Sequence, residues 1–298
     1  MPVPGYDDVR VRQFNDNLLM TDQQMKSFLR QGVTETRVKG KDFSFDRITD
    51  PTSIMSTIST RHGESTWADL SLSRRVGVTT NFGDGVMVDR EDLMRQLVDP
   101  RSAVAEELAG RFNRTLDLRV LIPAILGDAK TGETGSGTAA LGNQIVAGGT
   151  GLTLTKLREA RTLLLQGYVD LDREMMSLYT NAEGDEDLRS DSGLVSIDNV
   201  NNKPNESGRV LRVCGFDVHP CEALSLATGT YTGAALSSTS RPAILMSKSA
   251  VVMGVSEDMR AHVDEMPTHN HNTSIRLYAT VGAVRLYDER VVDIRFAE

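Results

Sequence analysis

Residues 93–135 decide the fold class of this chain, and their sequence is LMRQLVDPRSAVAEELAGRFNRTLDLRVLIPAILGDAKTGETG. Asp99 and Pro100 form a good helix start, because an aspartate accepts amide hydrogen bonds at the N-cap and a proline at the next position loses no helical bond. Apolar side chains then recur every four residues, at Val104, Leu108, Phe112, Leu116 and Val120. This spacing predicts a long helix with one buried stripe.

Pro123 lies near the end of this predicted helix. A proline removes an amide donor and crowds the carbonyl group of the preceding turn, here that of Arg119, so we expect the helix to kink or end near this position. Eight glycines follow between Gly127 and Gly151. Such a stretch is too flexible for a core element, so we expect a domain boundary in it.

Two segments before the helix alternate apolar and polar side chains, as strands do. The first is TETRVKGKDFSFDRI at residues 34–48, and the second is SLSRRVGVTT at residues 71–80. A polar connection separates them, which predicts a long hairpin with an extended tip. Because an isolated hairpin is marginally stable in water, we interpret this one as an interaction arm that lies against another surface.

The N-terminal residues 1–33 begin with a proline-rich stretch and continue with apolar residues at helical spacing. These apolar residues are Val11, Phe14, Leu18, Met25 and Phe28. The spacing predicts an amphipathic helix whose apolar face needs a partner surface.

The second half of the chain combines one more helix with several strands. Thr153 is a candidate N-cap for a helix over residues 154–166, and the acidic run at 181–191 is interpreted as a solvated loop or helix face. From Val210 onward short strands are expected, among them 250–255 and 259–266. The terminal segments SIRLYATVGAV and VVDIRF are expected to pair antiparallel through a turn at Asp288 and Glu289, and the whole pattern favours an α+β fold.

Composition excludes several classes of function. The 298 residues include 33 basic and 41 acidic side chains, and a net charge of −8 argues against a dedicated nucleic-acid-binding protein. No window approaches the run of about 18 apolar residues that a membrane span needs, and no export signal begins the chain. Cys214 and Cys221 are expected to be free thiols in a reducing compartment.

The search for catalytic chemistry is negative. The sequence contains neither a phosphate-binding loop nor a nucleophile elbow, so we expect no catalytic or cofactor-binding residues and no enzymatic activity. His262, His269 and His271, with Asp264 and Glu265, could hold a divalent metal. A polar loop with unliganded histidines is the favoured interpretation, because the spacing matches no defined metal motif.

The order of these parts, together with several strings, resembles that of tailed-bacteriophage major capsid proteins with the Hong Kong 97-like fold. The strings include TETRVKGKDFSFDRI, TRHG followed by SLSRRVGV, the 93–135 stretch, GLTLTKLREARTLL, VCGFDVHP and YATVGAVRLYDERVVDI. The resemblance implies an N-terminal arm (1–33), an extended loop (34–92), a peripheral domain (93–150 and 265–298) and an axial domain (151–264). It also implies pentamers and hexamers that close into an icosahedral shell around double-stranded DNA, with assembly in the host cytoplasm and a final location in the virion.

The resemblance also suggests which residues join subunits. We expect Phe43, Phe45 and Trp67 to be apolar anchors of the arm, with Phe14 on the N-terminal arm as a further contact, and Arg74 and Arg75 to pair with acidic neighbours. Two alternatives stay open: the phenylalanines could close a cluster within one subunit, and the arginines could form a solvated strand face.

Other partners follow from the same resemblance. A separate scaffolding protein is expected because the arm begins almost at Met1, and a portal protein and a decoration protein are further candidates. Lys39 and Lys41 lie at the base of the hairpin, so a covalent lysine–asparagine cross-link between subunits is not expected. Two alternatives remain for the function: a cellular nanocompartment shell of the same fold around cargo protein, and a metal-dependent enzyme that uses the histidines.

Overall fold

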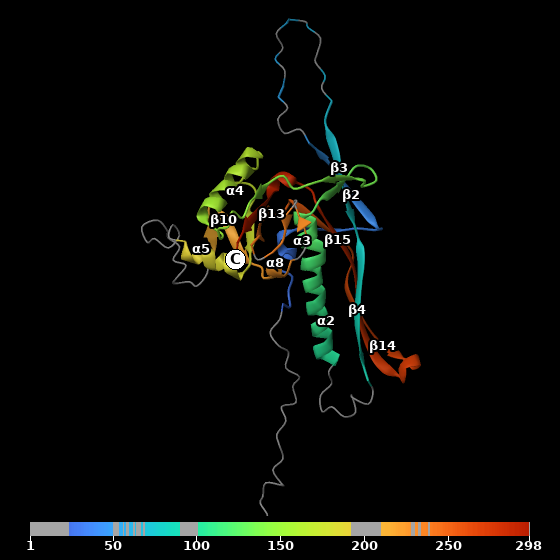
Figure 1. Ribbon diagram of the computed structural model, residues 1–298. Coiled ribbons are helices and arrows are strands. Elements are labelled where there is room, and N and C mark those ends of the chain that lie inside the picture. The colour runs from blue at the N-terminus through green and yellow to red at the C-terminus, as the bar shows by residue number, and fades with distance from the viewer. Residues whose placement is uncertain are drawn as a thin grey trace, which may run out of the picture.

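A long helix and three larger β-sheets are the main elements of the chain in its computed structural model (Figure 1). The structure describes residues 24–49, 54–55, 57, 60–61, 63, 67, 69–89, 101–191, 210–227, 230–231, 234–237 and 239–297. Most neighbouring strands are antiparallel, and helices occur between strands along the chain. The predicted α+β class is therefore confirmed.

The central helix has three consecutive parts: α2 (Arg101–Thr115), the π-helical segment η3 (Leu116–Leu121) and α3 (Ile122–Leu126). The predicted apolar stripe faces the core, with Val104 partly buried and the other four members buried. The four-residue spacing of the sequence therefore identified the face that packs.

The helix ends at Leu126, three residues after Pro123, in agreement with the predicted end near this proline. The sequence did not predict the π-helical turn that precedes it. There the N–H group of Ile122 donates to the carbonyl oxygen of Asp117, five residues earlier. A π turn is wider than an α turn, and this widening accommodates the proline ring that follows.

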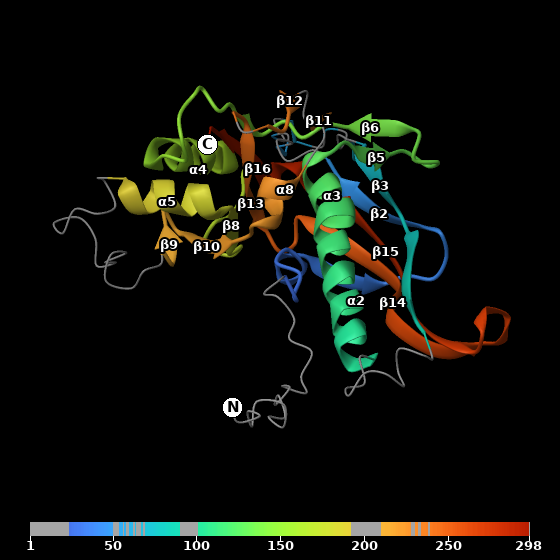
Figure 2. The same cartoon turned by 60° about the horizontal axis from the view of Figure 1, so that its bottom comes forward.

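Helix α2 packs on a four-stranded sheet with the strand order β1–β14–β15–β4 (Figure 2). The strands are β1 (Thr34–Arg37), β14 (Val251–Met266), β15 (Asn272–Arg285) and β4 (Thr80–Val88). β14 and β15 form a long hairpin closed by the short helix η4 (Pro267–His269). The prediction of separate strands at 250–255 and 259–266 is wrong, because two bulges let one continuous strand cover both segments.

A second, six-stranded sheet has the order β7–β16–β13–β8–β10–β9. Its strands are β7 (Gln144–Ile145), β16 (Val291–Phe296), β13 (Arg241–Ser247), β8 (Met176–Thr180), β10 (Phe216–Pro220) and β9 (Arg212–Val213). Helices α4 (Leu154–Gln166) and α5 (Ala182–Ser190) pack on it and share a second hydrophobic cluster with its strands. The remaining short elements are η2 (Arg30–Gly32), α8 (Ala223–Leu226), β11 (Thr230–Tyr231), β12 (Ala234–Ala235) and η5 (Asp288–Arg290).

The two terminal strands do not pair with each other, contrary to the prediction. β15 pairs with β14 and β4, whereas β16 pairs with β13 and β7. The turn η5 lies between them and carries Asp288, whose carboxylate accepts a hydrogen bond from Arg285 at 2.6 Å. Because this turn is tied to buried arginines, the chain passes from one sheet to the other instead of folding back on itself.

Helix α4 spans the predicted residues 154–166, but its N-terminus is not capped by Thr153. The amide of Leu154 donates instead to the carboxylate of Asp191 at 3.0 Å, and the amide of Leu152 donates to Asp187 at 2.7 Å. The acidic run is thus a helix, α5, whose far end supplies acceptors to its neighbour. A cap from a distant segment leaves no signal in the local sequence.

The glycine-rich stretch contains structure that the sequence did not predict. β5 (Ala129–Thr131) and β6 (Gly137–Ala139) join β2 (Asp42–Ile48) and β3 (Leu72–Val78) in a third sheet with the order β2–β3–β5–β6. Leu141 and Ile145 are buried in this stretch. The expectation that it forms no core element is therefore wrong, because its few apolar residues are carried into the core by neighbouring strands.

Only residues 24–33 of the predicted N-terminal helix lie within the described residues. They contain the single turn η2, so the helix prediction is wrong for Met25 and Phe28. Val11, Phe14 and Leu18 lie outside the described residues. The reason for the non-helical backbone is the carboxylate of Asp117, which accepts hydrogen bonds from the amides of Phe28 and Leu29.

Candidate assembly surface

Strands β2 and β3 form the predicted antiparallel hairpin, which extends away from the body of the molecule in Figure 1. Phe43 lies opposite Gly77, Phe45 lies opposite Arg75, and Ile48 lies opposite Leu72. The foot of the hairpin joins β5 through the pair Arg75–Thr131. The foot of the hairpin is therefore held by its pairing with β5 in the third sheet.

Phe43 packs into its own chain at the foot of the hairpin and is only 9% exposed. Glycines make the space for its ring: a Cβ atom at Gly77 would lie 2.2 Å from Phe43 Cζ, and one at Gly254 would lie 2.7 Å from Cε1. Phe45 meets the same ring edge to face, with centroids 6.0 Å apart, and stays half-buried. Phe43 thus belongs to a cluster within one subunit, and a contact of either ring with a neighbour remains a prediction.

Three arginines surround Asp288 beside this aromatic pair. Arg75 and Arg285 both donate to its carboxylate, and Arg47 approaches to 3.6 Å. The side chain of Arg75 is only 2% exposed. Burial lowers the pKa of Arg75, against the attraction of Asp288. Arg75 therefore has an acidic partner in its own chain. Its role at a subunit contact remains a prediction, although its charge is already paired within the subunit.

Arg74 differs from its neighbour because it points to solvent. It donates to the exposed carboxylate of Asp46, directly across the hairpin, at 2.6 Å. This hydrogen bond is the main reason why the pKa of Asp46 lies below its usual value. A solvated pair of this kind matches the alternative interpretation of the arginine as part of a solvated strand face, and it remains accessible to a partner.

Large apolar side chains lie exposed along the distal part of the hairpin. Trp67 is 93% exposed and Leu72 is 70% exposed, whereas Val76 near the foot is only 8% exposed. We call this set the distal hairpin patch; its members are Ile48, Ile54, Met55, Trp67, Leu70 and Leu72. A run of exposed apolar side chains on one projection marks a surface that another molecule covers.

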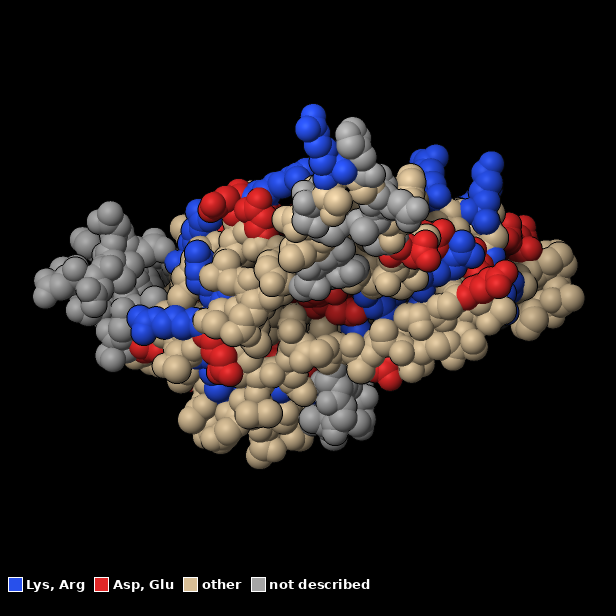
Figure 3. All heavy atoms as spheres, turned by 90° about the horizontal axis from the view of Figure 1, so that it is seen from above, with Lys and Arg blue, Asp and Glu red and all other residues tan. Residues whose placement is uncertain are grey.

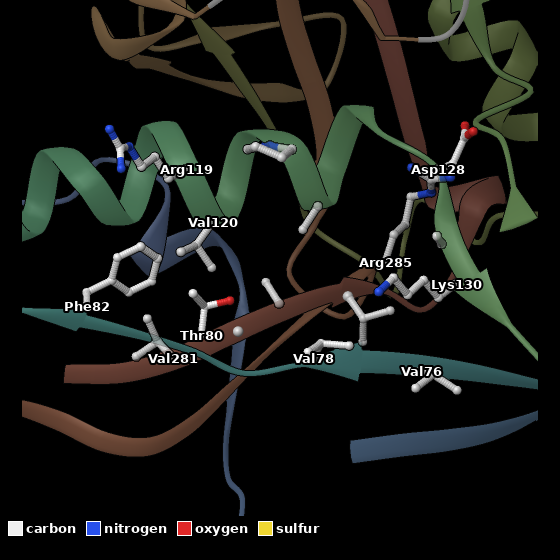
Figure 4. A pocket seen from close by; sticks show the side chains of 16 residues that line it. Val76, Val78, Thr80, Phe82, Arg119, Val120, Asp128, Lys130, Val281 and Arg285 are labelled. Atoms are coloured by element: carbon white, nitrogen blue, oxygen red, sulfur yellow. The ribbon is translucent and has the colours of Figure 1, made fainter. Parts of the chain in front are cut away.

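A pocket lies at the foot of the hairpin, between the central helix and strands β3, β4 and β15. We call it the foot pocket; its volume is about 220 Å³. Figure 4 shows Val120 pointing from the helix towards Val78, Thr80 and Val281 on the strands. Arg119, Asp128 and Lys130 lie among the lining residues. The pocket is therefore apolar on its floor and charged at its margin.

Charges are mixed on the face of the molecule that Figure 3 presents, where basic and acidic side chains lie interspersed. No single-sign patch of the kind that a duplex-binding protein uses is visible on the described part of that face. Among the described residues, no helix has both the length and the apolar composition for crossing a membrane.

The histidines do not converge on a metal site. His271 pairs with Glu265 at 3.0 Å, and His262 packs edge to face on Tyr278. Within the described part of the chain, no three or more His, Cys, Asp or Glu side chains are placed to hold a metal ion. Both Cys214 and Cys221 are free thiols, and burial raises the pKa of Cys221 to about 12.

Two buried charged residues, Asp117 and Lys156, were not identified from the sequence. Asp117 accepts hydrogen bonds from Ser27 at 2.5 Å and Gln24 at 2.6 Å, which holds the N-terminal segment on the central helix. Lys156 donates to four carbonyl oxygens, those of Ala147, Thr150, Gly151 and Arg295, at 2.8–3.0 Å. Each lies on a predicted helix, but no local pattern in the sequence indicates that its partners come from other segments.

Comparisons with known proteins agree with this architecture. The model of the phage capsid protein family matches residues 7–298, and no curated protein sequence is significantly similar to the chain. The capsid protein of cyanophage Pam1 superposes with a TM-score of 0.73 at 14% identity, covering 100% of this chain and 99% of that one.

Two further solved structures share the fold. The capsid of cyanophage P-SCSP1u has a TM-score of 0.72 at 15% identity, with coverage of 99% of this chain and 95% of that one. The mature capsid of bacteriophage PhiM1 has a TM-score of 0.74 at 11% identity, with coverage of 96% and 92%. With the family model matching nearly the whole chain, this protein belongs to the phage capsid protein family, as its sequence resemblance suggested.

Proposed function

We propose that this protein is the major capsid protein of a virion, and that its copies assemble as pentamers and hexamers into an icosahedral shell around double-stranded DNA. The observation that carries the proposal is the distal hairpin patch, whose apolar side chains lie exposed in the described part of the chain. An exposed apolar surface of this kind gains free energy when a second copy covers it. The capsid family and fold support the same role.

The arrangement of the hairpin suggests how copies join. The distal hairpin patch and the foot pocket lie at opposite ends of the same hairpin, so a chain cannot bring its own patch into its own pocket. A second copy can, and this head-to-tail contact forms a ring when the rotation from one copy to the next closes after five or six copies. We assign Trp67 and Leu72 to this contact, with Phe45 and Arg74 as accessible neighbours; Phe14 on the N-terminal arm stays a further candidate.

Each subunit in a shell touches several neighbours, so contacts that are individually weak become strong together. Two hydrophobic clusters support a peripheral and an axial domain, the first formed around the central helix and the second beside helices α4 and α5, and strands of the six-stranded sheet contribute side chains to both. The net charge of −8 fits a wall that contacts packaged DNA without binding it tightly. Scaffolding, portal and decoration proteins are the expected additional partners, with assembly in the host cytoplasm.

Electron microscopy and sedimentation of the purified protein test the proposal. The wild type is expected to form uniform closed particles. A triple variant, Trp67→Ser with Leu70→Ser and Leu72→Ser, should remain folded and monomeric, because these side chains are exposed in the subunit. The matched control, Trp67→Phe with Leu70→Met and Leu72→Met, keeps apolar surface and should still assemble.

Particles from the serine variant would refute the assigned contact, and a wild type that forms no closed particles either alone or in the infected host would refute the shell. The contents of the particles distinguish the two shell functions. Nuclease-protected duplex DNA in particles from an infected host supports the capsid, whereas a protein cargo without nucleic acid would support the nanocompartment alternative.

A further inference from the structure

Strand β4 forms one edge of the four-stranded sheet and pairs only with β15 among the described strands. Its nine residues, TNFGDGVMV, include no lysine and no proline. Proteins usually protect a long edge strand with these residues or cover it, because its free main-chain groups can pair with another strand. The edge of β4 therefore needs a cover.

The free main-chain groups can be located along β4. The N–H group of Gly85 donates to the side chain of its neighbour Asp84 at 2.8 Å, so it is not directed at β15. Main-chain groups alternate between the two sides of a strand. It follows that Asn81, Gly83 and Met87, like Gly85, turn their N–H and carbonyl groups towards the open edge.

The same stretch of β4 has a hollow on each face. On the helix side, a pocket of about 230 Å³ is lined by Phe82, Leu108, Phe112 and other residues, with Arg111 at its margin. On the opposite side, a shallow hollow of about 420 Å³ is lined by residues that include Gly83, Gly85 and Tyr278. A strand added at an edge directs its side chains alternately to the two faces. Both faces of this edge offer room for them.

We propose that residues 8–14 of the chain's own N-terminal segment, DVRVRQF, bind along the edge of β4 as an added strand. Val9 and Val11 alternate with Arg10 and Arg12, and β-branched residues favour strands. In this arrangement the two valines face the apolar side chains of the pocket on the helix side, those of Phe82, Leu108 and Phe112. The two arginines stay on the open face, where Tyr278 is partly exposed and its ring can receive a cation.

The length of the N-terminal segment allows this placement. The carbonyl oxygen of Met25 accepts a hydrogen bond from Asn113 at 2.8 Å, and Arg111, two residues earlier on α2, reaches Asp84 of β4 at 3.2 Å. The segment must therefore cross one helix, whose diameter is about 10 Å. Residues 15–23 can span about 30 Å when extended, which is ample. A tethered segment also binds at a high effective concentration.

Hydrogen exchange of the unassembled protein tests the inference independently of shell formation. In the full chain, the amides of Asn81, Gly83 and Met87 are expected to exchange roughly tenfold or more slowly than in a variant lacking residues 1–14. Val11→Pro, which removes one amide and disfavours a paired strand, should also accelerate exchange. Val11→Thr is the matched control, because it keeps the β-branched shape and should preserve the slow exchange.

Each other outcome overturns the proposal. Equal exchange of the three amides in the full chain and the shortened chain would show that the segment does not cover the edge. Slow exchange that appears only in assembled particles would assign the cover to a second copy. Protected amides in residues 11–23 beside an unprotected β4 would favour the helix that the apolar spacing predicts.

Discussion

Arg75, in the hairpin strand β3, donates a hydrogen bond to the carboxylate of Asp288, which lies 213 residues later in the turn between two sheets. The same carboxylate accepts a hydrogen bond from Arg285. The guanidinium of Arg285 also donates to the carbonyl oxygens of Ile125 and Gly127 at the end of the central helix. One aspartate thus links the hairpin, the helix and the crossing between sheets. This carboxylate therefore adds to the pairing with β5 in fixing the direction of the hairpin.

Asp288→Asn should destabilise the folded subunit by about 3 kcal/mol, because it leaves the buried guanidinium of Arg75 without a charged partner. Urea unfolding of the wild type and the variant measures the difference. Asp46→Asn is the matched control, since it breaks an exposed pair with Arg74 and should lower the midpoint far less than Asp288→Asn. Equal losses in both variants would contradict a special role for Asp288.

Gly77→Ala should lower the free energy of unfolding by about 2 kcal/mol, because the new Cβ atom would lie 2.2 Å from Phe43 Cζ and overlap the ring. Gly142→Ala is the control, since no atom lies within 4 Å of its Cβ position. Thermal unfolding compares the two variants. Adding Phe43→Leu to Gly77→Ala should recover part of the loss, and a double variant that is less stable than either single one would argue against this overlap.

Elements whose signal is local could be predicted from the sequence. The four-residue stripe from Val104 to Val120 identified the buried face of the central helix, and the alternation around Phe43 and Val76 identified the hairpin. Both patterns reflect the geometry of a single element, which its own residues determine. The bounds of α4 at 154–166 were predictable for the same reason.

Features that depend on distant partners could not be predicted. The expected pairing of the two terminal strands failed because Asp288 binds arginines from other segments. The burial of Arg75 could not be predicted for the same reason. Nothing in the local sequence shows which of Arg74 and Arg75 meets Asp288. Leu141 and Ile145 enter the core from a glycine-rich stretch only because β16 and its neighbours are present to receive them.

Lys156→Met should destabilise the subunit by about 3 kcal/mol, because four carbonyl oxygens lose the ammonium group that they share. Three of these oxygens belong to the loop at residues 147–151, so the variant should also speed the hydrogen exchange of this loop. Lys130→Met removes an exposed lysine and serves as the control. Unchanged stability of Lys156→Met would show that solvent replaces the ammonium group at little cost.

The stability of the subunit should depend on pH through Asp117. Burial raises the pKa of this carboxyl above its ordinary value of 3.8, although Ser27, Phe28, Gln24 and Leu29 donate hydrogen bonds to it. The folded state therefore keeps the proton at a pH where the unfolded chain has released it. By linkage, the free energy of unfolding falls as the pH rises through the window above 3.8, and the loss is complete above the raised pKa.

Comparison with Asp117→Asn isolates this effect, because the amide does not titrate. Urea unfolding of both proteins from about pH 4 to about pH 7 should show the wild type losing stability relative to the variant as the pH rises. Asp46→Asn provides a control of opposite sign, since its hydrogen bond to Arg74 lowers the pKa of Asp46. In this comparison the wild type should lose stability relative to Asp46→Asn as the pH falls. A pH-independent difference between wild type and Asp117→Asn would mean that the carboxyl titrates alike in the folded and unfolded chains, and that the four donors offset its burial.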